Sequence, residues 1–204
     1  MSKIIYSHYA SHLKKSECQT VHFGGTPKLV MSLYNSFSCM YLLIMFLISG
    51  KLIESATLLE EVCHQTHDPP FCLNILGSDP RTKNAGLPEL AGITIDLGSY
   101  SATGTKVKIH SLLLSGKFPQ LKTRLTVCDE NYAHAISELR EAAVRLKHGE
   151  YIDLNVDGGL AGQDGHDCEE AFKEPPAYRS PLTHENYRLE RFGEIITIIA
   201  NLLD

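Results

Sequence analysis

Hydrophobic residues recur at helical spacing through the middle of the chain. From residue 121 to residue 146 the steps between them are three and four positions, and the pattern stops at Gly149. This spacing puts the residues on one face of an α-helix, and glycine commonly ends such a helix. The pattern predicts a long amphipathic helix that buries Leu121, Leu125, Cys128, Tyr132, Ala135, Leu139, Ala142 and Leu146.

Two other stretches repeat this period and predict two more long helices. The earlier stretch is expected to bury Leu90, Ile93, Leu97, Tyr100, Gly104, Val107, Ser111 and Leu114. The later stretch follows Pro181 and is expected to bury Leu182, Leu189, Phe192, Ile196, Ile199 and Leu203.

The segment Tyr151–Phe172 has a weaker helical pattern because it contains four glycines. Each costs a helix about 1 kcal/mol relative to alanine. A helix is still expected, with Val156, Leu160, Cys168 and Phe172 on one side. Short connections at 116–119, 149–150 and 174–180 favour an all-α, up-down-up-down four-helix bundle. Residues 57–84, with prolines as breakers, are expected to form two or three short helices before it.

The longest apolar run, residues 40–48, lies near the N-terminus. As a helix its nine residues rise only about 14 Å, which is half the hydrocarbon thickness of a bilayer. It fits the hydrophobic region of a signal peptide better than a buried core helix. We expect residues 1–56 to be a leader, with a possible extension over 1–30 and a signal peptide over about 31–56. The mature domain would then be 57–204.

Four cysteines fall in the expected mature domain, and four cysteines allow three pairings. An even set suits a secreted protein in an oxidising compartment. The same region has 14 Lys and Arg against 22 Asp and Glu, a net charge of −8. This charge argues against nucleic acid as a partner. The four residues are Cys63, Cys72, Cys128 and Cys168.

Motifs that carry catalysis or bind cofactors are absent: there is no Gly-x-Ser-x-Gly, Walker loop, His-Glu-x-x-His or Cys-x-x-Cys. His64 and His67 lie beside Cys63, but exposed histidines explain them better than a metal site. One run matches the oxygen positions of an EF-hand loop and leaves calcium binding as an alternative function. That run consists of Asp153, Asn155, Asp157, Gly158, Leu160 and Asp164.

A set of short motifs, in order, resembles the plant invertase inhibitor and pectin methylesterase inhibitor family. It begins with Cys63-x-x-Thr66-x-x-Pro69-x-x-Cys72 and Ser78-Asp79-Pro80-Arg81. It continues with Cys128-Asp129-Glu130-Asn131-Tyr132-Ala133 and Gly149-Glu150-Tyr151-x-x-Leu154-Asn155. It ends with Cys168-Glu169-Glu170-x-Phe172, Pro175-Pro176, Pro181-Leu182 and the closing Ile199–Leu203.

The resemblance implies a four-helix bundle with an N-terminal helical hairpin and the disulfides Cys63–Cys72 and Cys128–Cys168. It also implies a secreted, apoplastic protein that is an enzyme inhibitor rather than an enzyme, without cofactors and without a membrane in its mature form. Invertase inhibitors often carry Pro-Lys-Phe after the glycine that ends the second bundle helix. Here Tyr151, Ile152 and Asp153 follow instead, which favours pectin methylesterase as target and leaves acid invertase as the alternative.

By the same resemblance, side chains on the second and third bundle helices would contact the target enzyme. Acidic groups are expected there, but two of the five positions carry a histidine and a serine. His134 is four residues after Glu130 and is expected to pair with it on one helix face. The five expected contact residues are Glu130, His134, Ser137, Asp167 and Glu170.

Overall fold

The computed structural model describes Tyr41 and residues 58–204. Apart from Tyr41, the expected leader lies outside the described residues, so its boundary near residue 56 stays a prediction. Across the described part of the chain, no helix combines the length and hydrophobicity that crossing a bilayer requires.

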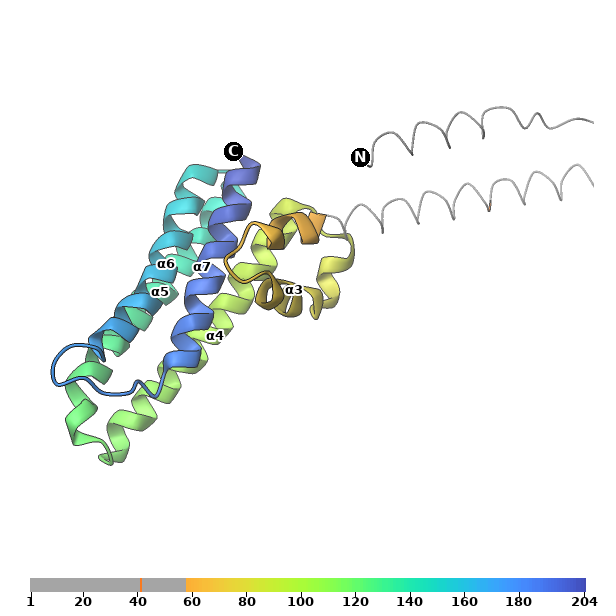
Figure 1. Ribbon diagram of the computed structural model, residues 1–204. Coiled ribbons are helices and arrows are strands. Elements are labelled where there is room, and N and C mark those ends of the chain that lie inside the picture. Colours follow the sequence, from red (N-terminus) through yellow and green to blue (C-terminus); the bar gives the residue numbers. More distant parts are fainter. Residues whose placement is uncertain (1–40, 42–57) are drawn as a thin grey trace, which may run out of the picture. The chain divides into compact units, whose positions relative to one another are not determined.

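The described residues form helices and no strands, which confirms the all-α prediction (Figure 1). Four long helices follow a compact N-terminal element, as the spacing of apolar residues predicts. Residues 58–64 are helical. They are followed by α3 (Pro69–Gly77), η1 (Pro80–Asn84), α4 (Leu87–Ser115), η2 (Pro119–Leu121), α5 (Lys122–His148), α6 (Tyr151–Ala171) and α7 (Thr183–Leu203).

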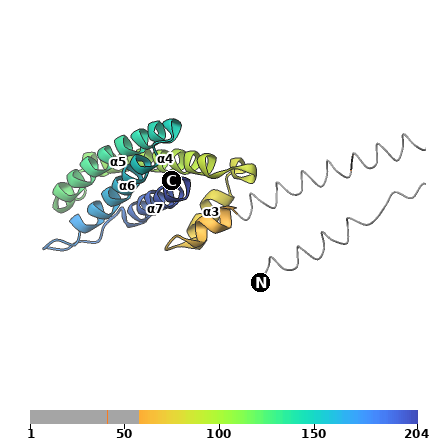
Figure 2. The same cartoon turned by 90° about the horizontal axis from the view of Figure 1, so that it is seen from above.

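The long helices pack in a closed ring in which α4 adjoins α5 and α7, and α6 adjoins the same two helices (Figures 1 and 2). Neighbours run antiparallel, since Cys128 of α5 meets Cys168 of α6 while Arg145 approaches Asp157. The turn from α5 to α6 is only two residues long because Gly149 adopts a left-handed conformation with φ 72°. The predicted up-down-up-down bundle is therefore confirmed.

The N-terminal element is the expected hairpin, closed by the Cys63–Cys72 disulfide. It packs against α4 and α7 through a hydrophobic cluster of its own, separate from the main core. The Phe71 ring meets the edges of Tyr187 and Phe192 at centroid distances of 5.9 and 5.8 Å. Hydrogen bonds from Tyr187 to Asp68 and from the His67 backbone to a Glu194 oxygen fasten it further.

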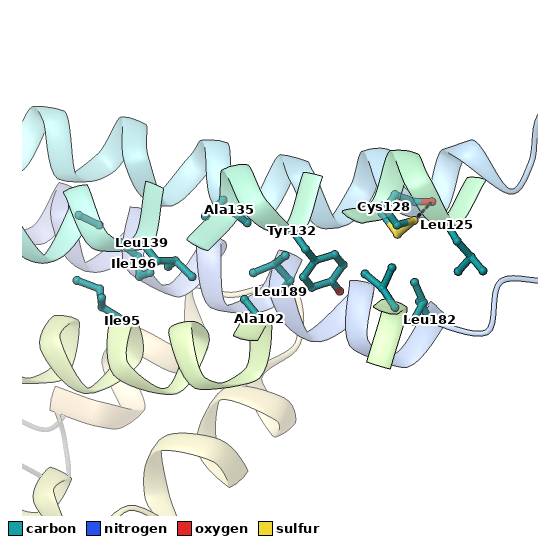
Figure 3. Packing of buried hydrophobic residues seen from close by; sticks show 14 of the residues in the cluster. Ile95, Ala102, Leu125, Cys128, Tyr132, Ala135, Leu139, Leu182, Leu189 and Ile196 are labelled. Atoms are coloured by element: carbon teal, nitrogen blue, oxygen red, sulfur yellow. Dashed lines mark hydrogen bonds between the residues drawn. A yellow bond between two sulfur atoms is a disulfide. The ribbon is translucent and has the colours of Figure 1, made fainter. Parts of the chain in front are cut away.

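Helix α5 supplies the large side chains of the main core, as predicted (Figure 3). Leu125, Tyr132 and Leu139 are buried and contact residues from the other bundle helices. The hydroxyl of Tyr132 donates a hydrogen bond to Asn186 of α7 over 2.9 Å. Burial raises the pKa of this hydroxyl well above its usual range, so it remains a donor at any physiological pH.

The predicted inner face of α4 is wrong beyond its first turns. Leu90 and Ile93 are buried, but Tyr100 is 84% exposed and Leu114 is 87% exposed. The core face instead consists of a different set of residues with the same seven-residue spacing, Ile95, Ala102 and Ile109. Both sets repeat every seven residues, so spacing alone does not distinguish them.

The predicted inner face of α6 is half right: Cys168 and Phe172 are buried, but Val156 and Leu160 are exposed. The buried side carries glycines, and these lie against α7. A Cβ added at Gly193 of α7 would stand 2.5 Å from the Gly158 carbonyl oxygen and 2.7 Å from the Gly162 Cα. Helices α6 and α7 therefore pack backbone against backbone, and only glycine fits between them.

Candidate functional site

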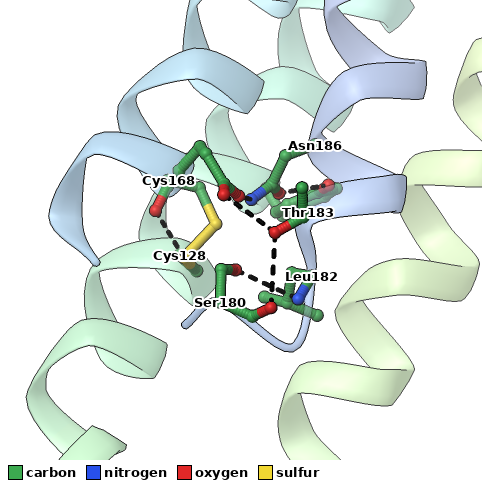
Figure 4. Close-up of a disulfide and its surroundings, with 8 residues drawn as sticks. Cys128, Cys168, Ser180, Leu182, Thr183 and Asn186 are labelled. Carbon is green, nitrogen blue, oxygen red and sulfur yellow. Dashed lines mark hydrogen bonds between the residues drawn. A yellow bond between two sulfur atoms is a disulfide. The ribbon is translucent and has the colours of Figure 1, made fainter. Parts of the chain in front are cut away.

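The Cys128–Cys168 disulfide joins α5 to α6 and fixes the position of the expected contact residues (Figure 4). Both cysteines are buried and their Cα atoms are 4.7 Å apart. Glu130 follows Cys128 by two residues, while Asp167 precedes and Glu170 follows Cys168. The bond thus holds together two segments, about 40 residues apart in sequence, that carry these three acidic residues.

Glu169 and Ser180 take part in hydrogen bonds behind this disulfide. Glu169 accepts hydrogen bonds from Thr183 over 2.8 Å and from the Asn186 side-chain nitrogen over 2.7 Å (Figure 4). Ser180 accepts one from the Leu182 backbone. These bonds attach the start of α7 to α6, so the acidic end of the face rests on a fixed base.

His134 occupies the middle of the face and pairs with partners other than the expected one. Its Nδ1 lies 2.8 Å from Asp164 of α6, and its Nε2 lies 3.2 Å from Glu138. The predicted pairing with Glu130 is therefore wrong. Both Glu130 and Glu138 are four residues away, but the imidazole turns toward α6, where Asp164 supplies a second carboxylate.

This cluster raises the pKa of His134, chiefly through the hydrogen bond with Asp164. Asp164 itself is only 8% exposed, and burial raises the pKa of its carboxyl, an effect that His134 partly offsets. The imidazolium form is thus favoured by two acids on two helices. At acidic pH it bridges α5 and α6 across the face.

A second polar group closes the other end of the α5–α6 seam. Arg145 donates to Glu150 over 2.7 Å and its Nε lies 3.8 Å from Asp157. Burial raises the pKa of the Asp157 carboxyl, and nearby Glu138 adds to the rise. The two helices are therefore connected at both ends and in the middle by charged or covalent links.

An exposed apolar row lies on α6 beside these polar groups. Ile152, Val156 and Leu160 follow each other at four-residue steps and are 68, 51 and 42% exposed. Sequence reasoning missed this row because it assigned Val156 and Leu160 to the core. The glycines at 158, 162 and 165 were the available signal, since they mark the opposite, buried side of the helix.

Four of the five expected residues lie within two helical turns of Cys128 or Cys168 along α5 and α6, and one of them, His134, pairs with Asp164 across the two helices. Glu130, His134 and Asp167 are exposed, and Glu170 is partly exposed, with its carboxylate on Lys173. Ser137 is partly buried one turn beyond His134. We define these five residues together with the apolar row as the α5–α6 face.

The calcium alternative finds no support. The run from Asp153 to Asp164 lies inside the unbroken helix α6, so its oxygens spread around a cylinder instead of surrounding one point. Asp164 and Asp157 are engaged with His134 and Arg145. Within the described residues, no group of three His, Cys, Asp or Glu side chains could hold a metal ion.

Similarity to known proteins agrees with this architecture. A pectinesterase inhibitor from Actinidia deliciosa is 37% identical over 146 residues, which cover 72% of this chain and 79% of the relative. Cell wall / vacuolar inhibitor of fructosidase 2 from Arabidopsis thaliana is 32% identical over 162 residues, covering 78% of this chain and 87% of the relative.

A crystal structure of a mutant form of a pectin methylesterase inhibitor from Arabidopsis matches with a TM-score of 0.63 at 28% identity. The match covers 70% of this chain and 95% of the solved one. The family profile described as plant invertase/pectin methylesterase inhibitor matches residues 57–201. With its hairpin, its bundle and both disulfides in place, the chain belongs to this family of plant inhibitors.

Proposed function

We propose that the protein is a secreted inhibitor that binds a plant cell-wall pectin methylesterase one to one and covers its substrate cleft with the α5–α6 face. The observation that carries this proposal is the composition of that face. Its apolar row can anchor the contact and exclude water, while the acidic groups around it can meet cations of the enzyme.

Rigidity supports the same mechanism. A protein that blocks a cleft needs no chemistry of its own, but it loses affinity if it must become ordered on binding. The disulfide, the His134–Asp164 pair and the backbone packing of α6 on α7 fix the face before it meets a target. The bundle is thus preorganised as a wedge.

Acid invertase is the second candidate target, since an inhibitor of fructosidase is among the similar proteins. The residues after Gly149, Tyr151, Ile152 and Asp153, differ from the Pro-Lys-Phe run often found in invertase inhibitors. In the structure Ile152 belongs to the exposed apolar row of the α5–α6 face. The absence of the Pro-Lys-Phe run after Gly149 favours the esterase as target.

The direct test titrates the purified chain against one pectin methylesterase and one acid invertase. We expect inhibition of the esterase only, and inhibition of the invertase alone would assign the target to the other branch. Val156→Asp should raise the inhibition constant at least about tenfold, because it places a charge in the apolar anchor. Val107→Asp is the matched control, since this valine of α4 is also exposed but lies outside the α5–α6 face.

The acidic part of the face has its own test. Glu130→Gln should weaken inhibition by a smaller factor, since an exposed charge at a rim contributes mostly to association. Glu60→Gln removes the same charge from the hairpin and should change nothing. Equal effects of the two substitutions would show that net charge, and not the face, determines affinity.

Secretion is part of the proposal, because two disulfides form readily only in an oxidising compartment. N-terminal sequencing of the protein recovered from the apoplast should find a start near residue 57. A product that retains residues 31–56 would contradict the expected signal peptide.

A further inference from the structure

An open groove of about 840 Å³ lies on the α4–α7 side of the bundle, at the end where η2 and the start of α7 meet. Its lining includes Lys108 of α4, Phe118 before η2, Arg179 in the connection to α7, and His184 and Tyr187 of α7. The groove is therefore built by three separate segments of the chain.

This groove is separate from the α5–α6 face, since none of its lining residues belongs to α5 or α6. In the ring of helices α4 and α7 are neighbours, while α6 lies across the bundle from α4 and α5 lies across from α7 (Figure 2). The hairpin packs on the same α4–α7 side, and Tyr187 touches both the hairpin and the groove. A ligand in the groove would leave the α5–α6 face free.

The charged side chains that line the groove are Lys108, Arg179 and Glu185. Lys108 is bound to Glu185 over 2.7 Å. Arg179 is exposed and has no ion pair with any described residue. An anion entering the groove would thus meet an uncompensated guanidinium.

Two aromatic rings give the groove flat apolar walls. Phe118 and Tyr187 are both partly exposed. Tyr187 is held in place by its hydrogen bond to Asp68 and by Arg191, which lies 5.3 Å from its ring centroid. Preordered aromatic surfaces beside a few polar groups are typical of small-molecule sites.

We propose that this groove binds an anionic oligosaccharide that bears carboxylates on its sugar rings. Sugar rings have apolar faces that can stack on Phe118 and Tyr187, and a guanidinium such as Arg179 can bind a carboxylate through two hydrogen bonds. The imidazole of His184 lies in the same lining and can donate a further hydrogen bond to a carboxylate. The concave shape fits a chain better than the flat surface of an anionic membrane.

The source of such a ligand rests on the proposed function. Hydrolysis of the methyl esters of pectin leaves carboxylates, so an esterase that this protein inhibits would be surrounded by polyuronate. Binding of that product in this separate groove would retain the inhibitor where de-esterification has occurred.

The test is calorimetric titration of the full chain, prepared with both disulfides formed, with a de-esterified oligogalacturonate at pH about 5. We expect binding to this probe and none to its fully methyl-esterified counterpart. The double variant Arg179→Gln/His184→Gln should lower the affinity about tenfold, since it removes the charge-assisted contacts. Phe118→Ala should weaken binding without changing charge.

The control Arg140→Gln/Lys147→Gln removes two exposed cations from α5 and should leave affinity unchanged. An equal loss in this control, or an absence of binding, would overturn the proposal. Binding to vesicles of anionic phospholipid as tight as to the oligogalacturonate would overturn the sugar assignment. Esterase inhibition is measured in parallel: a chain that binds the sugar acid but inhibits no esterase refutes the proposed function and leaves the groove site standing.

Discussion

Helices α5 and α6 lie side by side and are joined by a disulfide, yet they bury their inner faces by different means. The inner face of α5 consists of large side chains such as Leu125, Tyr132 and Leu139. The inner face of α6 includes Gly158, Gly162 and Gly165, and at these glycines the backbone of α7 fills the space that side chains would occupy. Helix α5 packs by the volume of its side chains, whereas α6 packs on α7 partly where side chains are absent.

This contrast explains why the sequence pattern identifies one inner face and misassigns the other. Hydrophobic spacing reports a buried face where apolar side chains form the contact. Where two backbones meet, the buried positions are glycines, and apolar residues such as Val156 and Leu160 can lie on the exposed side. A glycine-rich helical segment in a bundle should therefore be considered for close packing before it is considered weak.

The largest expected effect comes from cutting the link between the two helices. Replacing Cys128 and Cys168 together by serine should lower the free energy of unfolding by about 4 kcal/mol, since the bond closes a loop of about 40 residues. Equilibrium unfolding in urea measures this. Replacing Cys63 and Cys72 should lower it by only about 2.5 kcal/mol, because that loop is shorter; the reverse order would contradict the chain-entropy argument.

The next largest effect is expected from truncating a large buried side chain of α5. Leu139→Ala should destabilise the protein by about 3 kcal/mol, because Leu139 is fully buried and the truncation leaves a cavity. The same urea experiment applies. A loss below about 1 kcal/mol would mean that the core around α5 collapses to fill the gap, and the contrast with α6 would weaken.

The close backbone packing of α7 on α6 is tested by adding a single methyl group. Gly193→Ala should cost about 2 kcal/mol or more, because the new Cβ would collide with the backbone of α6. Gly159→Ala is the matched control on α6, since its Cβ would meet nothing closer than 4.0 Å. That variant should gain about 0.5–1 kcal/mol from helix propensity. Similar results for both variants would refute the close approach.

The smallest effect concerns the charged bridge between the two helices. Because the folded state raises the pKa of His134, the stabilisation is fully present below the unfolded pKa and is lost as pH rises through the folded value. Relative to His134→Gln, the parent protein should therefore lose stability as pH rises above about 6.5, the ordinary pKa of histidine, by less than about 1 kcal/mol because the imidazole is half exposed. Parallel stability curves for the two proteins would exclude the bridge.

Local sequence was sufficient for the helices, their order and the connections, because helical period, Gly149 and the prolines act within a few residues. It was insufficient on α4, where the set of positions that contains Ala102 and the set that contains Val107 both repeat every seven residues and both fit one helix face. It also could not find the His134–Asp164 pair, since these residues are 30 positions apart and meet only once the bundle forms. The disulfide pairing came from family resemblance, not from spacing.

The meeting of Gly193 with Gly158 and Gly162 also has a mechanical consequence. Sliding α7 along α6 by one turn would set a side chain against the backbone, so the two helices can move only together. Local opening of α6 then requires displacement of α7 as well, and the two helices form one cooperative unit. Despite its four glycines, α6 should hold its amide hydrogens against exchange with solvent about as long as α7 does.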